Sequence, residues 1–220
     1  MDQVVVDNDA NMGALAESRL GVGSGVKNFL YVKVGTGIGM GIVVNGDVYR
    51  GSHGGAGEFG HIQVDQNGKV CPCGHRGCLE TVVGADAVVA DANRQRGTTA
   101  KATISDIAQV VEMALAGDSA CVQAIEHAGK QLGMCLARMA NVLNPERIII
   151  DGGLAEAGEI LLGPVRQSLQ QHTVRLIWQS LGEAHIVSGM LRAKAIATGA
   201  ALSTLDRVFS LPTVDAPQTT

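Results

Sequence analysis

The sequence predicts an α/β protein, and two observations lead to this prediction. Short runs of β-branched and aromatic residues alternate with longer segments of helical periodicity, and one pair of these runs meets at an Asn-Gly dipeptide. Alternation of strands and helices is typical of layered α/β folds, while Asn-Gly between apolar runs is the strongest short-range signal of a β-hairpin. We therefore expect a sheet covered by helices, with a glycine-rich hairpin in its first half.

Length and composition indicate a folded protein. Of the 220 residues, 46% are apolar and 17% are charged, which is enough for a substantial core in one domain or one and a half. A net charge of −4 without a basic patch argues against nucleic-acid binding by this chain itself. No apolar run approaches the length of a membrane span and the first residues do not form a signal peptide, so we expect a cytoplasmic location and no membrane partner.

The first predicted elements are a very short β run at residues 4–6 and a helix from Ala10 to about Leu20. Acidic and amide residues at positions 7–11 lie where a helix N-cap belongs, and capping is the simplest role for Asp9.

The predicted hairpin contains a run of glycines. A strand at residues 29–34 leads through glycine-rich residues 35–41 into a second strand at 42–44, the Asn-Gly turn and residues 47–49. Closely spaced glycines let backbone amides approach a phosphate, but the run is about as typical of a tight turn in a sheet. It is neither a Walker motif nor a Rossmann fingerprint, because no helix follows it.

The most informative stretch is a loop with three cysteines, Cys71, Cys73 and Cys78. Their C-x-C-x4-C spacing among glycines and a proline allows tight turns while the thiolates converge on a metal. His61 and His75 compete for the fourth position. We favour His61, because a ligand from outside the loop would pin it to the strand that we expect at residues 57–64. Thiolate and imidazole ligands together suit zinc, and the alternative is three reduced thiols without a metal.

Two carboxylates accompany this loop. Glu58 precedes His61 by three residues, and Glu80 follows the last cysteine by two. Folding around a metal would bring these three side chains together, with the second ring nitrogen of His61 free for a neighbour or a ligand. Two carboxylates and an imidazole can bond the vicinal hydroxyls of a sugar. Either glutamate alone would more commonly be a solvated surface residue.

The rest of the chain predicts helices around two further strands. Helical patterns cover residues 79–94, 104–116 and 119–143, and a buried parallel strand at 147–150 precedes a Gly-Gly turn and a helix at 157–170. A strand at 184–187 and a helix at 191–208 follow, and a Pro/Thr-rich tail is expected to be disordered. Cys121 and Cys135 fall in helical patterns and are assigned to the core.

These motifs resemble the ROK family (repressor, open reading frame, kinase), whose members are bacterial sugar kinases and sugar-responsive repressors. The resemblance covers essentially the whole chain, and the metal loop with Glu58-Phe59-Gly60-His61 is its most specific part. It implies the actin-like, or ribonuclease-H-like, large lobe with a pocket for a hexose or amino sugar. It also implies structural zinc held by His61, Cys71, Cys73 and Cys78.

The resemblance further implies roles for individual residues. Asn8 and Asp9 match an Asn-Asp pair that contacts the sugar, and in a kinase Asp9 would be the general base toward the phosphorylated hydroxyl. The implied sugar-binding residues are Asn8, Asp9, Glu58, His61 and Glu80. The implied nucleotide-binding residues, at the phosphates and the adenosine of ATP, are Gly35, Thr36, Gly37, Gly39, Gly152 and Gly153.

By the same resemblance, residues 1–28 are the remnant of a small amino-terminal lobe and residues 29–190 form the large lobe, with its zinc loop at 61–80. A carboxy-terminal helix is expected at 191–210 and the disordered tail at 211–220. The Asp-x-Gly-Gly-Thr-like phosphate loop of the family does not occur in the sequence, nor does a helix-turn-helix. We therefore expect a fragment with negligible kinase activity of its own.

Two functions follow from the resemblance. Two features look more like the repressors. One is Lys33, where kinases more often carry a neutral residue, and the other is the amino-acid sequence of residues 60–64. We favour the sugar-binding effector portion of a transcriptional regulator, which would reach DNA through an upstream domain. The alternative is part of a glucokinase-like, ATP-dependent hexose or amino-sugar kinase, which would need ATP and Mg²⁺. A homodimer is expected by analogy.

Overall fold

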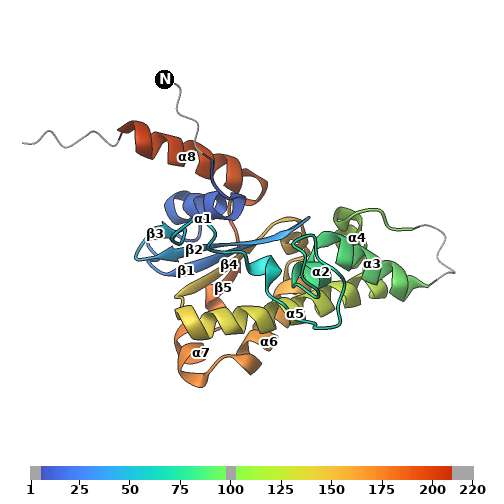
Figure 1. The fold of residues 1–220 in the computed structure, drawn as a ribbon. Coiled ribbons are helices and arrows are strands. Elements are labelled where there is room, and N and C mark those ends of the chain that lie inside the picture. Colours follow the sequence, from blue (N-terminus) through green and yellow to red (C-terminus); the bar gives the residue numbers. More distant parts are fainter. Residues whose placement is uncertain (1–5, 98–102, 210–220) are drawn as a thin grey trace, which may run out of the picture.

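A computed structural model describes residues 6–97 and 103–209, and it contains a mixed sheet of five strands in the order β3-β2-β1-β4-β5 (Figure 1). The strands are β1 (Phe29–Val34), β2 (Ile38–Val44), β3 (Asp47–Tyr49), β4 (Arg147–Asp151) and β5 (Ile186–Ser188). The first three strands are antiparallel, whereas β4 and β5 run parallel to β1. The predicted α/β class and glycine-rich hairpin are confirmed.

β1 is the central strand and carries both kinds of pairing. Lys33 lies opposite Gly39 of β2 on one side and opposite Asp151 of β4 on the other. Because paired residues point to the same face of a sheet, these three positions share one face. Strands covered on both faces read as continuous apolar runs, which is what the residues of β1 and β4 show.

Helices cover both faces of the sheet (Figure 1). The helices are α1 (Asp9–Leu20), α2 (Glu80–Val83), α3 (Ala85–Arg96), α4 (Ile107–Leu115), α5 (Ser119–Leu143), α6 (Glu159–His172), α7 (Arg175–Leu181) and α8 (Ala195–Phe209). α1 packs on one face and α8 packs on α1, while α5 and α6 lie on the opposite face. Short 3-10 segments occur at Phe59–His61, Gly153–Ala157, Glu183–His185 and Arg192–Lys194.

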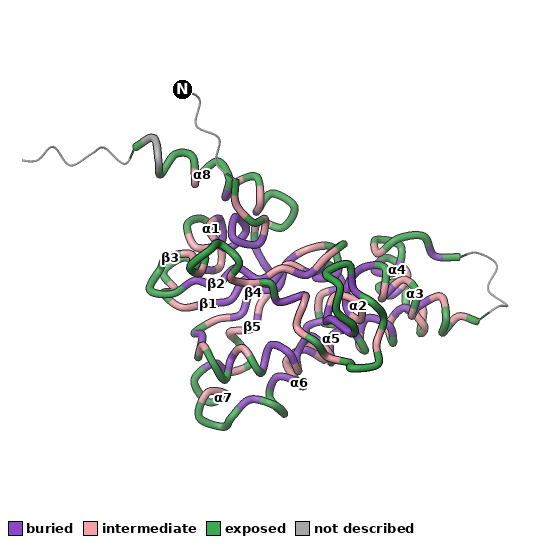
Figure 2. Tube along the Cα trace, viewed as in Figure 1, coloured by how far each residue is buried: buried purple, intermediate pink, exposed green. Residues whose placement is uncertain are grey.

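The side chains of β1 divide between two cores. Leu30, Val32 and Val34 enter the large core beneath the sheet, which α5 and α6 complete. Phe29 and Tyr31 point to the other face and pack against the alanines of α1. In Figure 2 the buried residues follow the strands and the inner sides of the helices, whereas the cysteine loop is largely exposed. Cys121 and Cys135 are fully buried in the large core, as predicted.

Four sequence expectations need correction. Residues 57–64 do not form a strand: Gly57, with φ +91°, bonds to β2, and the chain then turns into the 3-10 segment. The helix expected at 79–94 is two helices, because Gly84 adopts an extended conformation between α2 and α3. Gly39 lies inside β2 rather than in a turn. The helix α7 had not been expected at all.

Other boundaries moved by a few residues, while α5 has the predicted limits. The expected β run at residues 4–6 lies mostly outside the described residues, as does the tail. No helix within residues 6–97 and 103–209 is long and apolar enough to cross a membrane.

Candidate functional site

The cysteine loop gathers four potential metal ligands. The ligand atoms of His61, Cys71, Cys73 and Cys78 all lie within 4.8 Å of one another. Nδ1 of His61 is 3.5 Å from the sulfur of Cys71, and the sulfurs of Cys73 and Cys78 are 3.6 Å apart. Ligands of a tetrahedral zinc with usual bond lengths are separated by about 3.6–3.8 Å, so the donor set and its spacing fit this ion.

Backbone hydrogen bonds shape the loop. The N–H of Cys71 donates to the carbonyl of His75 at 2.7 Å, and the N–H of Gly74 donates back to the carbonyl of Cys71 at 2.9 Å. Gly77 has φ +63°, and a Cβ there would lie 1.6 Å from the carbonyl oxygen of Asp65, so only glycine fits. The chain after Cys78 then bonds to Ile62, which places the last cysteine beside the His61 segment.

The structure distinguishes the two histidines. His61 belongs to the group of four, whereas His75 is exposed and its Nδ1 lies 3.6 Å from the sulfur of Cys73 alone. Hydrogen bonds from the backbone and side chain of His75 lower the pKa of the Cys73 thiol to about 6. Burial raises the pKa of the Cys78 thiol to about 12, so binding of a metal there would release a proton.

The two ring nitrogens of His61 face different neighbours. Nδ1 lies beside the sulfur of Cys71, while Nε2 is 3.7 Å from a carboxylate oxygen of Glu58. Metal binding through Nδ1 would leave Nε2–H as a donor next to that carboxylate. The Glu58 side chain is 59% exposed, so it remains accessible to a ligand. The structure thus places Glu58 beside the ring nitrogen of His61 that faces away from the sulfur of Cys71.

Glu80 is the first residue of α2, and its carboxylate lies beside the first residue of β2. Its carboxylate accepts a hydrogen bond from the backbone N–H of Ile38 at 3.0 Å, and a Cβ on Gly37 would come within 2.6 Å of it. It also borders a pocket of about 220 Å³ that Thr36 lines. Among the described residues, no hydrogen bond or ion pair connects Glu80 with Glu58 or His61.

Glycines at alternate positions, Gly39 and Gly41, leave one face of β2 without side chains, and the start of α1 packs closely there. A Cβ on Gly39 would lie 3.7 Å from a carboxylate oxygen of Asp9, and one on Gly41 would meet the Ala10 carbonyl at 2.5 Å. Gly37, just before β2, lies beside the carboxylate of Glu80, and Gly39 lies beside the amino terminus of α1. Gly39, which sequence reasoning assigned to the phosphates of ATP, thus lies beside the start of α1, where a Cβ on it would be 3.0 Å from that of Ala10.

The segment at residues 57–60, which precedes the cysteine loop, runs along an edge of β2. The carbonyl of Gly57 accepts a hydrogen bond from the N–H of Met40 at 3.1 Å, and a Cβ on Gly60 would lie 2.4 Å from the carbonyl oxygen of Ile38. The first half of β2 thus contacts the segment that carries Glu58 and His61. It also lies beside Glu80, which accepts a hydrogen bond from the N–H of Ile38, and beside Asp9, which is near Gly39. The fold therefore brings these distant parts of the sequence to one strand.

At the start of α1, the N-cap is Asn8 and not Asp9. The side-chain oxygen of Asn8 accepts a hydrogen bond from the N–H of Ala10 at 2.8 Å. Asp9 is the first helical residue, and its carboxylate forms an ion pair with the ammonium group of Lys33. Lys33 is on β1 opposite Gly39 of β2, and because Gly39 has no side chain, Lys33 can extend over it to Asp9. Sequence reasoning identified both residues but not their contact.

A second pocket lies where β4 ends. It has a volume of about 230 Å³, and its lining includes Lys33, Asp151, Gly152, Gly153 and Arg192. Gly152 has φ +98°, and a Cβ there would collide with the carbonyl of Val34 at 2.4 Å.

Asp151, which is 4% exposed, accepts hydrogen bonds from the Tyr31 hydroxyl at 2.9 Å and from the Gly152 N–H at 2.7 Å. Burial, followed by the Asp151 charge, raises the pKa of Tyr31, which therefore remains a donor. Sequence reasoning missed Tyr31 and Arg192, because nothing local indicates that they meet Asp151 and Gly152.

Comparison with known proteins identifies this arrangement. A mixed sheet with helices on both faces and a Cys/His cluster beside its hairpin is matched by an actin-like sugar kinase fold. A sequence model of the ROK family matches residues 2–206, so the chain belongs to the ROK family.

Its relatives include both enzymes and repressors. A glucokinase of Halalkalibacterium halodurans is 40% identical over 78% of this chain and 55% of its own length. A putative xylose repressor of a Caldicellulosiruptor species is 34% identical over 84% of this chain and 50% of its own length. The chain thus spans about half the length of these relatives.

Solved structures divide in the same way. A ROK family transcriptional regulator, a homolog of the E. coli MLC protein, superposes with a TM-score of 0.78 and 35% identity, covering 90% of this chain and 50% of that one. A ROK family glucokinase from Streptomyces griseus, in complex with glucose and AMPPNP, gives 0.79 and 31% identity, covering 91% and 67%. Family and fold are therefore shown, while the relatives do not distinguish a regulator from a kinase.

Proposed function

We propose that this chain is the sugar-binding effector portion of a ROK transcriptional regulator, with zinc at the Cys/His cluster. The observation that carries the choice of a regulator over a kinase is the ion pair between Lys33 and Asp9. In the regulator function, the chain works in the cytoplasm as part of a homodimer, and a domain outside this sequence contacts the DNA.

The support for a sugar ligand is the set of groups around the first half of β2. Nε2 of His61 supplies a donor, Glu58 an exposed carboxylate, and Asn8 a side-chain amide whose NH₂ is not used by the helix cap. Neighbouring sugar hydroxyls each donate and accept, so alternating donors and acceptors suit them. A metal bound through Nδ1 would fix the ring of His61 in the orientation that presents Nε2.

The support for a regulator is electrostatic. A general base in phosphoryl transfer must accept the proton of the attacking hydroxyl. In this structure one carboxylate oxygen of Asp9 already accepts a charge-assisted hydrogen bond from Lys33, so that oxygen is occupied by a protein partner. Asp9 can still accept a hydrogen bond from a sugar hydroxyl through its other oxygen. The geometry is therefore better suited to binding than to transfer.

A sugar kinase is the second candidate, and it has its own support. A glucokinase is 40% identical to this chain over 183 residues, and the glycine turns at 35–37 and 152–153 are both present with open space beside them. In this alternative Gly35, Thr36, Gly37 and Gly39 lie near the phosphates, and Gly152 and Gly153 near the adenosine. ATP and Mg²⁺ would supply the phosphoryl group and its charge neutralisation.

A binding assay on this chain and a turnover assay on the full-length protein of which the chain is expected to be a part distinguish the two. Titration calorimetry with glucose, xylose and N-acetylated amino sugars should detect binding of at least one sugar to the zinc-loaded chain. A coupled assay with ATP and Mg²⁺ should detect no phosphorylation of that sugar. Phosphoryl transfer would establish the kinase function, and absence of binding across the panel would remove the sugar-binding proposal altogether.

A further inference from the structure

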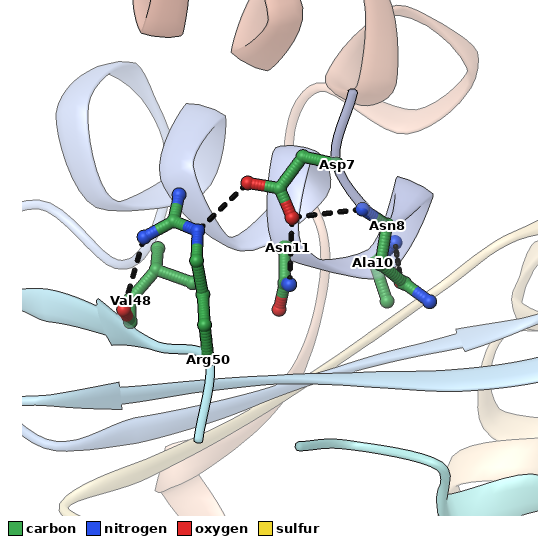
Figure 3. A network of polar contacts seen from close by, with 6 residues as sticks. All are labelled: Asp7, Asn8, Ala10, Asn11, Val48 and Arg50. Atoms are coloured by element: carbon green, nitrogen blue, oxygen red, sulfur yellow. Dashed lines mark hydrogen bonds and ion pairs between the residues drawn. The ribbon is translucent and has the colours of Figure 1, made fainter. Parts of the chain in front are cut away.

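A polar network joins the start of α1 to the segment that follows β3 (Figure 3). Asp7 is at its centre. One carboxylate oxygen accepts hydrogen bonds from the N–H of Asn8 at 2.8 Å and the side-chain NH₂ of Asn11 at 2.9 Å. The other oxygen accepts from Nε of Arg50 at 2.8 Å, and a terminal nitrogen of Arg50 donates to the carbonyl of Val48 at 3.2 Å. Figure 3 shows Arg50 reaching from the β3 side of the sheet toward Asp7 above it.

Arg50 also closes a glycine-rich loop through its backbone. Its carbonyl accepts a hydrogen bond from the N–H of Ala56 at 3.1 Å, so residues 51–55 form a loop with joined ends. Gly51, with φ +72°, makes the turn that permits this closure. The next residue after Ala56 is Gly57, which bonds to β2 and leads directly to Glu58. The position of Arg50 therefore determines where this loop begins and ends.

Asp7 forms the end of the network that lies at the start of α1. It immediately precedes Asn8 and is itself 12% exposed at the side chain, and Asn11 is buried. The side-chain oxygen of Asn11 has no hydrogen-bond partner among the described residues, whereas its NH₂ donates to Asp7. Although burial acts in the opposite direction, hydrogen bonds from Asn11, Arg50 and the Asn8 backbone lower the pKa of the Asp7 carboxyl. Asp7 is thus charged at neutral pH and bonded on both oxygens.

We propose that Arg50 and Asp7 are positioning residues that hold the Asn8–Asp9 side and the Glu58–His61 side of the sugar site in register. This inference rests on the proposed sugar-binding function, because it concerns the geometry of that site. Neither residue needs to contact the sugar. Their link sets the distance between the start of α1 and the loop that leads to Glu58.

The chain offers a contrasting ion pair on the same helix. Arg19 of α1 pairs with Asp206 of α8 at 3.4 Å, and both side chains are more than half exposed. Exposed pairs of this kind contribute little, because solvent screens them and side-chain entropy opposes them. Arg50 differs because it makes two fixed bonds to a largely buried carboxylate and a carbonyl. Arg19 is therefore a matched control.

The test compares Arg50→Gln, Arg50→Lys and Arg19→Gln in the zinc-loaded chain. Calorimetry with glucose or xylose, whichever binds the unsubstituted protein more tightly, should show Kd raised about tenfold for Arg50→Gln, since a charge-assisted bond to a buried carboxylate is lost. Arg50→Lys should restore part of the affinity, and Arg19→Gln should change Kd less than twofold. In a double-mutant cycle with Asp7→Asn, the two losses should not add, because both remove the same link.

Hydrogen exchange provides a readout that does not depend on sugar. Without ligand, Arg50→Gln should speed amide exchange in residues 8–11 and in residues 51–57 together, with unchanged zinc content. If the unsubstituted protein binds neither sugar, the proposed function fails, and exchange alone decides this inference. Unchanged exchange in both segments, or unchanged sugar affinity in Arg50→Gln, would overturn it. So would loss of zinc in that variant, which would indicate general damage to the metal loop.

Discussion

The cysteine loop and the α1-facing side of the sheet make a useful comparison. In the loop, the candidate ligands lie within 18 residues of sequence, and local turns bring them together. On the sheet, Asp9, Lys33 and Asp151 come from three elements far apart in the chain. The first site depends on short-range geometry and, in our proposal, on a metal, whereas the second depends on the register of β1 against its neighbours. The comparison predicts that each site can be altered without the other, except where His61 connects them.

The largest effect is expected from Cys73→Ser. Loss of one thiolate should abolish stoichiometric zinc binding, and the chain should lose about 4 kcal/mol of stability when free zinc is a thousandfold above Kd. Metal content by atomic emission and thermal unfolding with and without zinc measure both effects.

The matched control is His75→Ala, which removes the histidine near Cys73 that lies outside the group of four. This variant should keep its zinc. Zinc loss in His75→Ala together with zinc retention in His61→Ala would reverse our assignment of the fourth ligand.

The next largest effect concerns the sheet side. Asp9→Asn should weaken sugar binding by about 10- to 100-fold, because a charged acceptor is replaced by a neutral amide and Lys33 loses its partner. Zinc content should not change. Calorimetry with the best-binding sugar measures the first expectation. If zinc binding falls as well, the two sites are not separable as the comparison requires.

A smaller effect should come from a helix cap remote from both sites. The side chain of Asp118 accepts hydrogen bonds from the N–H groups of Ala120 and Cys121 at the start of α5. Asp118→Ala should lower the free energy of unfolding by about 1 kcal/mol without changing zinc or sugar affinity.

These hydrogen bonds, first that from the Cys121 backbone, lower the pKa of the Asp118 carboxyl below its usual value. The contribution is therefore present above the usual Asp pKa and is lost as pH falls through the lowered one. Urea unfolding of the variant and the unsubstituted protein should converge in acid. A constant difference down to pH 2 would contradict this account.

The smallest stability effect is expected for Lys33→Thr. The ion pair with Asp9 is partly exposed, so its loss should cost about 0.5 kcal/mol, similar to an exposed pair. Lys27→Thr, at an exposed loop position, is the control. Urea unfolding of the two variants and the unsubstituted protein measures this difference. Phosphorylation of glucose by the full-length protein would contradict the regulator function.

The comparison also explains what the sequence could predict. The limits of α5 were predicted correctly, because Asp118 and the left-handed Asn144 are local start and stop signals. The gathering of the candidate metal ligands was predicted for a similar reason, since the cysteine spacing favours convergence of the sulfurs. In both cases the determining interactions lie within a few residues of sequence.

Features that depend on tertiary packing were not predicted. The strand expected at residues 57–64 is replaced by a turn because Gly57 and Gly60 lie against the backbone of β2. α7 has seven residues, too short to show a clear period, and Ile177 and Trp178 pack it against the large core. The contact between Lys33 and Asp9 depends on which residues β1 and β2 place opposite each other, which the sequence alone does not specify.

The central claim is that a metal at the cysteine loop shapes a sugar-binding site through His61. The most direct test is calorimetric titration of one sugar into zinc-loaded protein, into chelator-treated protein, and into that protein after zinc is restored. We predict that sugar binding is lost with the metal and recovered with it, while α5 and the sheet remain folded by circular dichroism. Equal sugar affinity with and without zinc would contradict the claim.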